Sequence, residues 1–273
     1  MQFSLIQVDV ADDIATLTMN DPASRNGLTV TMQQEMLAAL AQLALRDDVG
    51  ALIVTGAGQS FCAGANLGQL DDNADSGATL GQRGARMMEK YANPLILALQ
   101  ELPFPVIAAV NGAAAGAGIS LALAADITIA ARSAFFIAPF LPRLGIVPDL
   151  GASWFLPRLA GRARTMGLVL LGERLPAETA LQWGLIWECA DDAMLLERAR
   201  ELARQLACAP AHSALEARRA LAASERNDLA GQLDYEMERQ RELLDRPTFQ
   251  EGVNAFFEKR EPRFTRPPRA GGN

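Results

Sequence analysis

The chain has 273 residues, half of them hydrophobic, and a formal net charge of −7. This length and composition suffice for one large globular unit with a buried core, and the acidic balance argues against nucleic-acid binding, which needs clustered positive charge. No uncharged apolar run reaches the roughly 20 residues of a membrane-spanning helix, and the N-terminus lacks the basic and apolar regions of a signal peptide. We therefore expect a cytoplasmic protein without a membrane segment.

The N-terminal part predicts a hairpin followed by a helix. Residues 3–10 and 14–19 alternate apolar and polar side chains around a short turn, which is typical of two antiparallel strands. Residues 31–45 repeat apolar side chains at helical spacing, with Thr31 as the expected N-cap. A short apolar run at residues 51–55 then predicts a buried strand.

The next segment, SFCAGANL at residues 60–67, consists mainly of small side chains and is expected to turn into a helix. Small residues allow a ligand to approach backbone N–H groups closely, so this turn is a candidate site. Cys62 within it admits two interpretations, a nucleophile or a small buried filler. Without a neighbouring base, the filler is favoured.

Strands and helices continue to alternate through the middle of the chain. Residues 79–102 predict a long helix, and residues 105–110, 127–131 and 135–138 predict short strands. The repeated order of strand and helix indicates an α/β fold with parallel sheets.

The stretch NGAAAGAGISLALAAD, residues 111–126, joins a predicted strand to a helix that is apolar on every face. Gly116 and Gly118 flank Ala117 where that helix begins, and helix starts carry unpaired N–H groups and partial positive charge. This turn could therefore donate hydrogen bonds to a carbonyl oxygen that gains negative charge during a reaction. Two alternatives are tight strand–helix packing and a nucleotide-phosphate loop, although the third glycine of a dinucleotide fingerprint is missing.

Asp149 stands out in LGIVPDLG, residues 144–151, because its neighbours are apolar. Burial among such neighbours disfavours the charged form and raises the pKa of a carboxyl group toward values useful for proton transfer. A helix N-cap is the competing interpretation, since an aspartate before a helical segment is good capping chemistry.

The C-terminal part is predicted to be mainly helical, at residues 193–207, 211–224, 229–244 and 249–259. We expect two regions, a core of residues 1–207 and a helical region of residues 208–273 that docks on the core or on a neighbouring subunit. The single histidine, His212, lies in this helical region and no motif points to it. Three widely spaced cysteines predict neither disulfides nor a zinc site.

Three stretches together resemble the crotonase, or enoyl-CoA hydratase/isomerase, superfamily: residues 60–67, 105–131 and 144–192. The resemblance runs essentially end to end and includes AFFEKREPRF near the C-terminus. The third stretch is most similar to the phenylacetate-pathway branch. That branch isomerises ring-1,2-epoxyphenylacetyl-CoA to the oxepin-CoA and also shifts double bonds in enoyl-CoAs.

This resemblance implies a spiral of ββα units with a C-terminal helical trimerisation layer, assembled as a homotrimer or a dimer of trimers. It implies an acyl-CoA substrate with no metal and no further cofactor, and a thioester oxygen held by the N–H groups of Ala65 and Ala117. Asp149 falls at the position of the acid/base carboxylate of the family's isomerases. The residues expected to bind substrate or CoA are Arg25, Ala63, Ala65, Asn66, Leu67, Gly116, Ala117, Phe140, Leu141, Phe256 and Lys259.

Two departures from the family's hydratases bear on the reaction. The positions of their two glutamates hold Ser120 and Leu141 here. Adding water needs one group that activates water and another that delivers a proton, whereas moving a double bond needs a single proton carrier. The sequence therefore favours an isomerase using Asp149 over a hydratase. An aspartyl nucleophile acting on aryl-CoA esters and a non-catalytic RNA-binding homologue remain the other hypotheses.

Overall fold

The computed structural model describes residues 3–66 and 77–264. Its strands form two sheets, a six-stranded sheet in the order β1-β2-β3-β5-β7-β10 and a four-stranded sheet in the order β4-β6-β8-β9. The strands are β1 (Ile6–Ala11), β2 (Ile14–Met19), β3 (Ala51–Gly56), β4 (Ser60–Cys62), β5 (Val106–Val110), β6 (Ala113–Ala115), β7 (Ile127–Ala131), β8 (Phe135–Ile137), β9 (Leu175–Pro176) and β10 (Glu188–Ala190).

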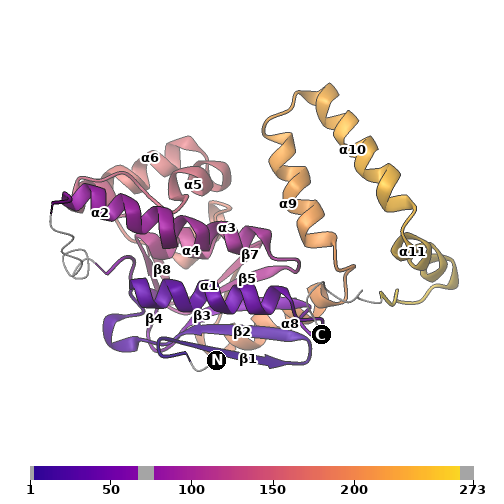
Figure 1. Cartoon of the computed structure of the whole chain (residues 1–273), viewed down its shortest axis with the longest axis horizontal. Coiled ribbons are helices and arrows are strands. Elements are labelled where there is room, and N and C mark those ends of the chain that lie inside the picture. Colours follow the sequence, from indigo (N-terminus) through magenta and orange to yellow (C-terminus); the bar gives the residue numbers. More distant parts are fainter. Residues whose placement is uncertain (1–2, 67–76, 265–273) are drawn as a thin grey trace.

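Helices cover these sheets, and the described chain from Leu195 to Glu258 is mainly helical (Figure 1). They are α1 (Val30–Ala44), α2 (Leu80–Met87), α3 (Asn93–Glu101), α4 (Ala117–Leu123), α5 (Ala152–Ala160), α6 (Arg162–Leu171), α7 (Ala177–Gln182), α8 (Leu195–Ala207), α9 (Ser213–Ser224), α10 (Leu229–Leu244) and α11 (Pro247–Glu258). No helix in the described ranges has the length and apolar character needed to cross a membrane.

The chain winds between the two sheets as a spiral of ββα units. Successive strands alternate between sheets: β3, β5 and β7 belong to the larger sheet, and β4, β6 and β8 to the smaller one. Within each sheet these neighbours pair in parallel, which requires a crossover connection after each pair of strands. The predicted α/β fold with parallel sheets is confirmed, as is the antiparallel hairpin of β1 and β2.

Burial explains why the central strands are continuous apolar runs. Every residue of β3 and β5 is buried, as expected for parallel strands covered on both faces. Helix α8 packs against β3, β5 and β7, while α4, buried along its whole length, packs against strands of both sheets. The apolar character of α4 on every face therefore reflects its place inside the molecule.

Two details of the helices differ from expectation. Helix α1 is capped by Thr29, whose hydroxyl accepts a hydrogen bond from the Met32 N–H, so the prediction of Thr31 as the cap is wrong. The long helix predicted for residues 79–102 is interrupted by a π-helical turn, Met88–Ala92, between α2 and α3. Such turns occur often at functional sites, and this one borders the cavity described below.

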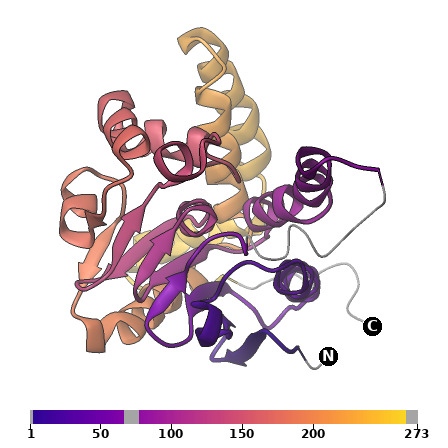
Figure 2. The ribbon, with the colours of Figure 1, turned by 90° about the vertical axis from the view of Figure 1, so that its left-hand side faces the viewer.

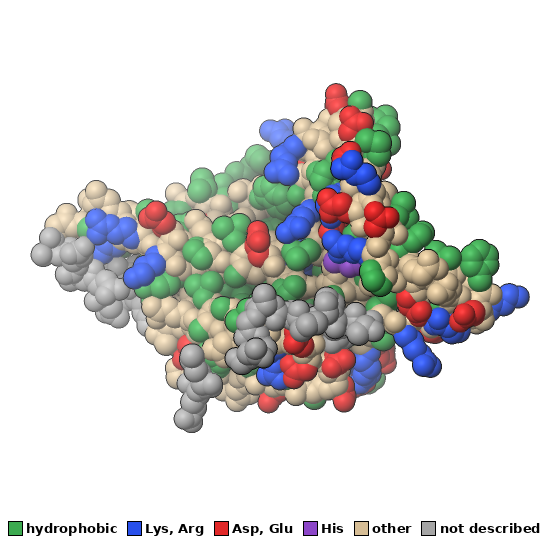
Figure 3. All heavy atoms as spheres, turned by 45° about the vertical axis from the view of Figure 1, so that its right-hand side comes forward, with side chains coloured by type: hydrophobic (Ala, Val, Ile, Leu, Met, Phe, Trp, Pro, Cys, Tyr) green, Lys and Arg blue, Asp and Glu red, His purple; other side chains and the backbone are tan. Residues whose placement is uncertain are grey.

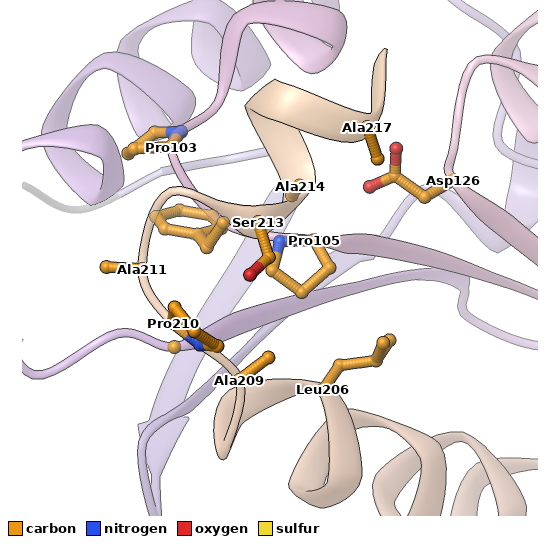
Figure 4. A pocket seen from close by; sticks show the side chains of 12 residues that line it. Pro103, Pro105, Asp126, Leu206, Ala209, Pro210, Ala211, Ser213, Ala214 and Ala217 are labelled. Carbon is orange, nitrogen blue, oxygen red and sulfur yellow. The ribbon is translucent and has the colours of Figure 1, made fainter. Parts of the chain in front are cut away.

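The last three helices, α9 to α11, extend away from the sheets (Figures 1 and 2). The Arg218 guanidinium on α9 anchors them to the core by pairing with the Asp126 carboxylate, with N–O distances of 2.6 Å. A cavity of about 240 Å³ lies at the root of α9, where Pro103 and Pro105 of the core lie opposite Pro210 and Ala214 (Figure 4). The expected boundary between residues 207 and 208 stays a prediction.

Candidate active site

A cavity of about 380 Å³ lies between α1, α2, the start of α4 and the segment that leads into α5. This volume falls within the range of roughly 300–1,000 Å³ typical of small-molecule sites. The cavity brings together residues predicted from distant parts of the sequence: Ala63, Ala65, Ala117, Phe140 and Asp149 all line it. Gly116 and Asn66 line it too.

The backbone of Ala65 is turned toward this cavity by pairing with Leu28. The two residues form an isolated parallel bridge, in which the Leu28 N–H donates to the Gly64 carbonyl at 2.8 Å and the Leu28 carbonyl accepts from the Asn66 N–H at 3.3 Å. This pairing uses the groups before and after Ala65. Within the described part of the chain, no acceptor is bonded to the Ala65 N–H itself.

Ala117 is the first residue of α4, so its N–H has no partner within the helix. Gly116, just before it, adopts φ 53° and ψ −123°, a conformation that glycine reaches without strain. The Gly116 N–H donates to the Ile137 carbonyl at 3.0 Å, which anchors the start of α4 to the smaller sheet. The Ala117 N–H therefore provides a second donor, strengthened by the partial positive charge of the helix N-terminus.

Two glycines allow the Ala65 and Ala117 turns to approach each other. A methyl group on Gly64 would lie 2.8 Å from the Ala115 carbonyl oxygen and 3.4 Å from the Ala117 nitrogen. A methyl group on Gly118 would lie 2.3 Å from the Cys62 carbonyl oxygen. The small side chains of both motifs thus produce the close approach that a shared oxyanion site requires.

The backbone of Asp149 is held firmly. Its carbonyl oxygen accepts hydrogen bonds from the Ser120 hydroxyl at 2.8 Å and from the Ala152 N–H at 2.9 Å. Leu150, which follows, has a φ of 47°, a conformation that a leucine rarely adopts. Local strain of this kind is concentrated at functional sites, where the surrounding structure over-determines the backbone.

The Asp149 carboxyl group, in contrast, has one oxygen without a partner in the part of the chain that the structure describes. Its Oδ1 is buried and accepts no hydrogen bond from the described residues. Burial raises the pKa of this carboxyl group above its ordinary value, against a smaller lowering by the backbone N–H of the same residue. Helix α5 is capped by Gly151 without a side-chain hydrogen bond, so the N-cap interpretation of Asp149 is wrong.

The other predicted binding residues divide into three groups. Arg25 is exposed beside the cavity rim, where its carbonyl accepts from the Ala63 N–H at 3.0 Å. Leu67 lies outside the described residues. Phe256 and Lys259 are exposed at the end of α11, on the opposite side of the molecule from α2 (Figure 1).

Leu141 was expected to line the cavity, but it does not. The π-helical turn Phe140–Leu144 directs Phe140, Arg143 and Leu144 to the cavity wall. Leu141 on the same turn is 37% exposed and is not among the lining residues.

Three further polar residues considered in the sequence analysis do not line the cavity. Cys62 is fully buried, and burial raises the pKa of its thiol to about 12, in agreement with the filler interpretation. Ser120 is also fully buried and its hydroxyl is committed to the Asp149 carbonyl. His212 directly precedes α9 and does not line the cavity. No group of three or more His, Cys, Asp or Glu side chains in residues 3–66 and 77–264 could hold a metal ion.

Gln33 is a buried polar residue among the lining residues that sequence reasoning missed. Gln33, on α1, is 5% exposed and lines the cavity beside the Leu28–Ala65 bridge. In the sequence it falls inside an amphipathic helix and carries no motif. The available signal was a glutamine at a position where the helical repeat of α1 predicts a buried apolar side chain.

Comparisons with known proteins identify the family and the fold of this chain. The sequence pattern described as enoyl-CoA hydratase/isomerase matches residues 9–267. The chain is 44% identical to a 1,2-epoxyphenylacetyl-CoA isomerase of Escherichia coli, over 97% of this chain and 99% of that protein. It is 40% identical, with the same coverage of both proteins, to a probable enoyl-CoA hydratase of Rhodobacter capsulatus. A crystal structure of an enoyl-CoA hydratase from Polaromonas superposes with a TM-score of 0.88 at 32% identity, covering 95% of this chain and 99% of that one.

Proposed function

Because this chain belongs to the enoyl-CoA hydratase/isomerase family, we propose that it is an acyl-CoA isomerase with Asp149 as its single acid/base. One observation carries the proposal. Asp149 is the only carboxylate among the described residues that line the cavity, and its Oδ1 has no partner there. One proton carrier suffices to move a double bond, whereas hydration needs a second group.

The proposed double-bond shift begins with a 3-enoyl thioester bound with its carbonyl oxygen between the Ala65 and Ala117 N–H groups. The Asp149 carboxylate takes a proton from the carbon next to the thioester carbonyl, and the electron pair of that C–H bond delocalises as a dienolate. The two N–H groups stabilise the negative charge on oxygen. The protonated Asp149 then returns the proton two carbons further along, giving the conjugated 2-enoyl thioester.

The raised pKa of Asp149 suits this role. A buried carboxylate is a stronger base than one in water, and its conjugate acid still gives the proton back to a dienolate. The apolar wall formed by Met87, Met88, Phe140 and Leu150 maintains this environment and excludes water from the reacting carbons.

We further propose ring-1,2-epoxyphenylacetyl-CoA, which is converted to its oxepin, as a substrate. The support is the relative named 1,2-epoxyphenylacetyl-CoA isomerase, which matches over nearly the full length of both chains. The CoA part would lie along Arg25, Ala63, Asn66 and Leu67, which continue from the Ala65 turn in sequence or contact it.

A substrate panel tests the proposed reaction. Purified protein is incubated with 3-enoyl-CoA, 2-enoyl-CoA and ring-1,2-epoxyphenylacetyl-CoA, and products are followed by absorbance and mass. We expect conjugated 2-enoyl-CoA to form from the 3-enoyl ester, and the epoxide ester to be converted without a change of mass. A product heavier by one water molecule would instead establish hydration.

Hydratase activity is the second candidate, because the Rhodobacter capsulatus relative bears that name. It would require a water-handling group besides Asp149, and the hydroxyl of Ser120 is already bonded to a backbone carbonyl. Crotonyl-CoA separates the two candidates, since hydration removes its conjugated absorbance. We expect that absorbance to persist.

Replacing Gly64 should damage the oxyanion site. In Gly64→Ala the new methyl group meets backbone atoms of Ala115 and Ala117, and the residue keeps a φ of 95° that alanine rarely adopts. We expect kcat for 3-enoyl-CoA to fall about 100-fold, comparable with the loss of one oxyanion donor. Gly167→Ala is the matched control, because a methyl group there meets nothing within 4 Å. Equal kcat in the two variants would contradict the oxyanion assignment.

A second copy of this chain is proposed to cover the apolar faces of the C-terminal helices, as a trimer or a dimer of trimers. Hydrophobic side chains are exposed along these helices (Figure 3). On α10, Leu229, Leu233 and Met237 are 76%, 56% and 58% exposed and recur every four residues, so they share one face. Phe256 and Phe257 on α11 are more exposed still, at 79% and 77%. Such an assembly would also bring Phe256 and Lys259 to the CoA end of a neighbouring cavity.

Charges placed on this face should prevent association. We expect the double variant Leu233→Glu with Met237→Glu to elute as a monomer in size-exclusion chromatography with light scattering, where the unaltered protein gives an oligomer. Burying two carboxylates without partners in an apolar interface is strongly unfavourable. Glu238→Lys alters charge on a different face of α10 and should leave the assembly intact. A monomeric unaltered protein would refute the proposed assembly.

A further inference from the structure

Gln33 is a buried amide in the wall of the candidate active site. It is 5% exposed, and it lines the same cavity as Ala65, Ala117 and Asp149. Its position on α1 is fixed from the helix start, where the Gln33 N–H donates to the Thr29 carbonyl at 3.0 Å. A buried amide is expected to have both of its polar atoms satisfied, so its contacts show what it does.

The nitrogen of this amide contacts Leu28, the residue that pairs with Ala65. Gln33 Nε2 donates to the Leu28 carbonyl at 3.4 Å, and the same carbonyl accepts from the Asn66 N–H at 3.3 Å. Because Leu28 O is an acceptor, the amide must face it with its nitrogen. Leu28 pairs with Ala65 through the Gly64 carbonyl and the Asn66 N–H, so the Ala65 N–H takes no part in the bridge. By holding the Leu28 carbonyl, Gln33 helps to set the direction of the Ala65 N–H.

The oxygen of the amide has no comparable structural role. Gln33 Oε1 is buried, and no donor in the described ranges bonds to it. A buried acceptor left without a donor opposes folding, and an apolar side chain of similar size would avoid that cost. The amide oxygen therefore contributes no hydrogen bond to the described part of the fold, and departures of this kind from good packing are expected where a residue serves a site.

We propose that Gln33 is a positioning residue for the oxyanion site, holding the Leu28 carbonyl so that the Ala65 N–H meets the thioester oxygen. The inference rests on the proposed function, because it assigns Gln33 a part in stabilising the enolate of that reaction. Gln33 does not touch the reacting atoms. Its effect passes through Leu28 to Ala65.

Gln33→Met separates this role from a structural one. Methionine has a similar volume but cannot hold the Leu28 carbonyl. We expect kcat for 3-enoyl-CoA to fall about 10- to 100-fold with KM changed less than about threefold, since a small misplacement near the reacting centre can cost this much. The melting temperature should stay equal or rise, because the unpaired Oε1 is removed. Gln34→Met, an exposed neighbour on the same helix, is the matched control and should change neither quantity.

A spectroscopic readout reports the oxyanion site without turnover. Hydrogen bonds to the carbonyl of a conjugated thioester such as cinnamoyl-CoA polarise it and shift its absorbance to longer wavelength. We expect this shift on binding to the unaltered protein and a smaller one with Gln33→Met at saturating ligand. An unchanged shift with unchanged kcat, or a lower melting temperature with a raised KM, would overturn the inference. If the unaltered protein shifted the spectrum but isomerised no thioester, the proposed function would fail while the positioning role stood.

Discussion

Asp149→Asn is expected to lower kcat at least about 1,000-fold while the dissociation constant of an acyl-CoA ligand changes less than about threefold. Asparagine has the same shape but cannot accept a proton, and general acid–base groups typically contribute about 100- to 10,000-fold. The oxyanion donors and the cavity wall are untouched, so binding remains. Turnover by absorbance and binding by calorimetry measure the two quantities separately.

The control for this substitution is Asp9→Asn, which makes the same chemical change on the exposed face of β1. It should leave both kcat and binding unchanged. Turnover by Asp149→Asn within tenfold of the unaltered enzyme would mean that another group moves the proton. Loss of binding would instead indicate that Asp149 shapes the cavity.

The pH dependence follows from the raised pKa of Asp149. The base must be ionised to accept a proton, so kcat/KM should rise with pH through a pKa above the usual aspartate value of about 3.9. The stability of the fold depends on pH in the opposite direction, because the folded state binds the Asp149 proton more tightly than the unfolded state does. The stabilisation that this proton provides is complete below the unfolded-state pKa of Asp149. It is lost as the pH rises through the folded-state pKa. Asp149→Asn should therefore melt higher than the unaltered protein at pH 7, and the difference should shrink toward pH 4.

The two turns that carry the backbone donors could be predicted from the sequence, because each depends on small side chains within a few consecutive residues. Small side chains at residues 63–65 and 116–118 are visible in the sequence, and they act through close backbone approach. The role of Asp149 was harder to predict, because a catalytic carboxylate and an N-cap aspartate can have the same local sequence. The structure excludes the N-cap by placing Gly151 at that position, and it leaves Oδ1 without a partner among the described residues, while the catalytic role of Asp149 stays a prediction.

Other features depended on contacts between distant segments. Gln33 gains its role only because Leu28 pairs with Ala65, and no pattern within α1 reveals that pairing. Leu141 was expected at the cavity from its position in the family pattern, but in its π-helical turn the side chain is 37% exposed and does not line the cavity. This turn stands alone between β8 and α5, so no apolar periodicity in the sequence predicts its conformation or the directions of its side chains.

Arg218→Met is expected to lower the apparent free energy of unfolding by about 3–5 kcal/mol, as found when one partner of a buried ion pair is removed. The Arg218 and Asp126 side chains are only 11% and 22% exposed. All of the guanidinium donors are used: besides Asp126, they bond to the carbonyls of Gln100, Leu102 and Phe104 at 2.6–3.0 Å. The variant would leave Asp126 with the Val106 N–H as its remaining donor, at 2.7 Å.

The loss should be concentrated where α9 joins the core. Urea denaturation gives the overall change, and hydrogen exchange should show faster exchange in α9 than in β3 or β5, because this ion pair fastens α9 to the start of β5. Arg219→Met, an exposed neighbour on the same helix, should have little effect. Arg218→Lys keeps the charge but cannot reproduce the five donors of the guanidinium group. Its free energy of unfolding should therefore lie between those of Arg218→Met and Arg219→Met. Equal stability of the Arg218 and Arg219 variants would mean that apolar contacts alone hold the C-terminal helices to the sheets.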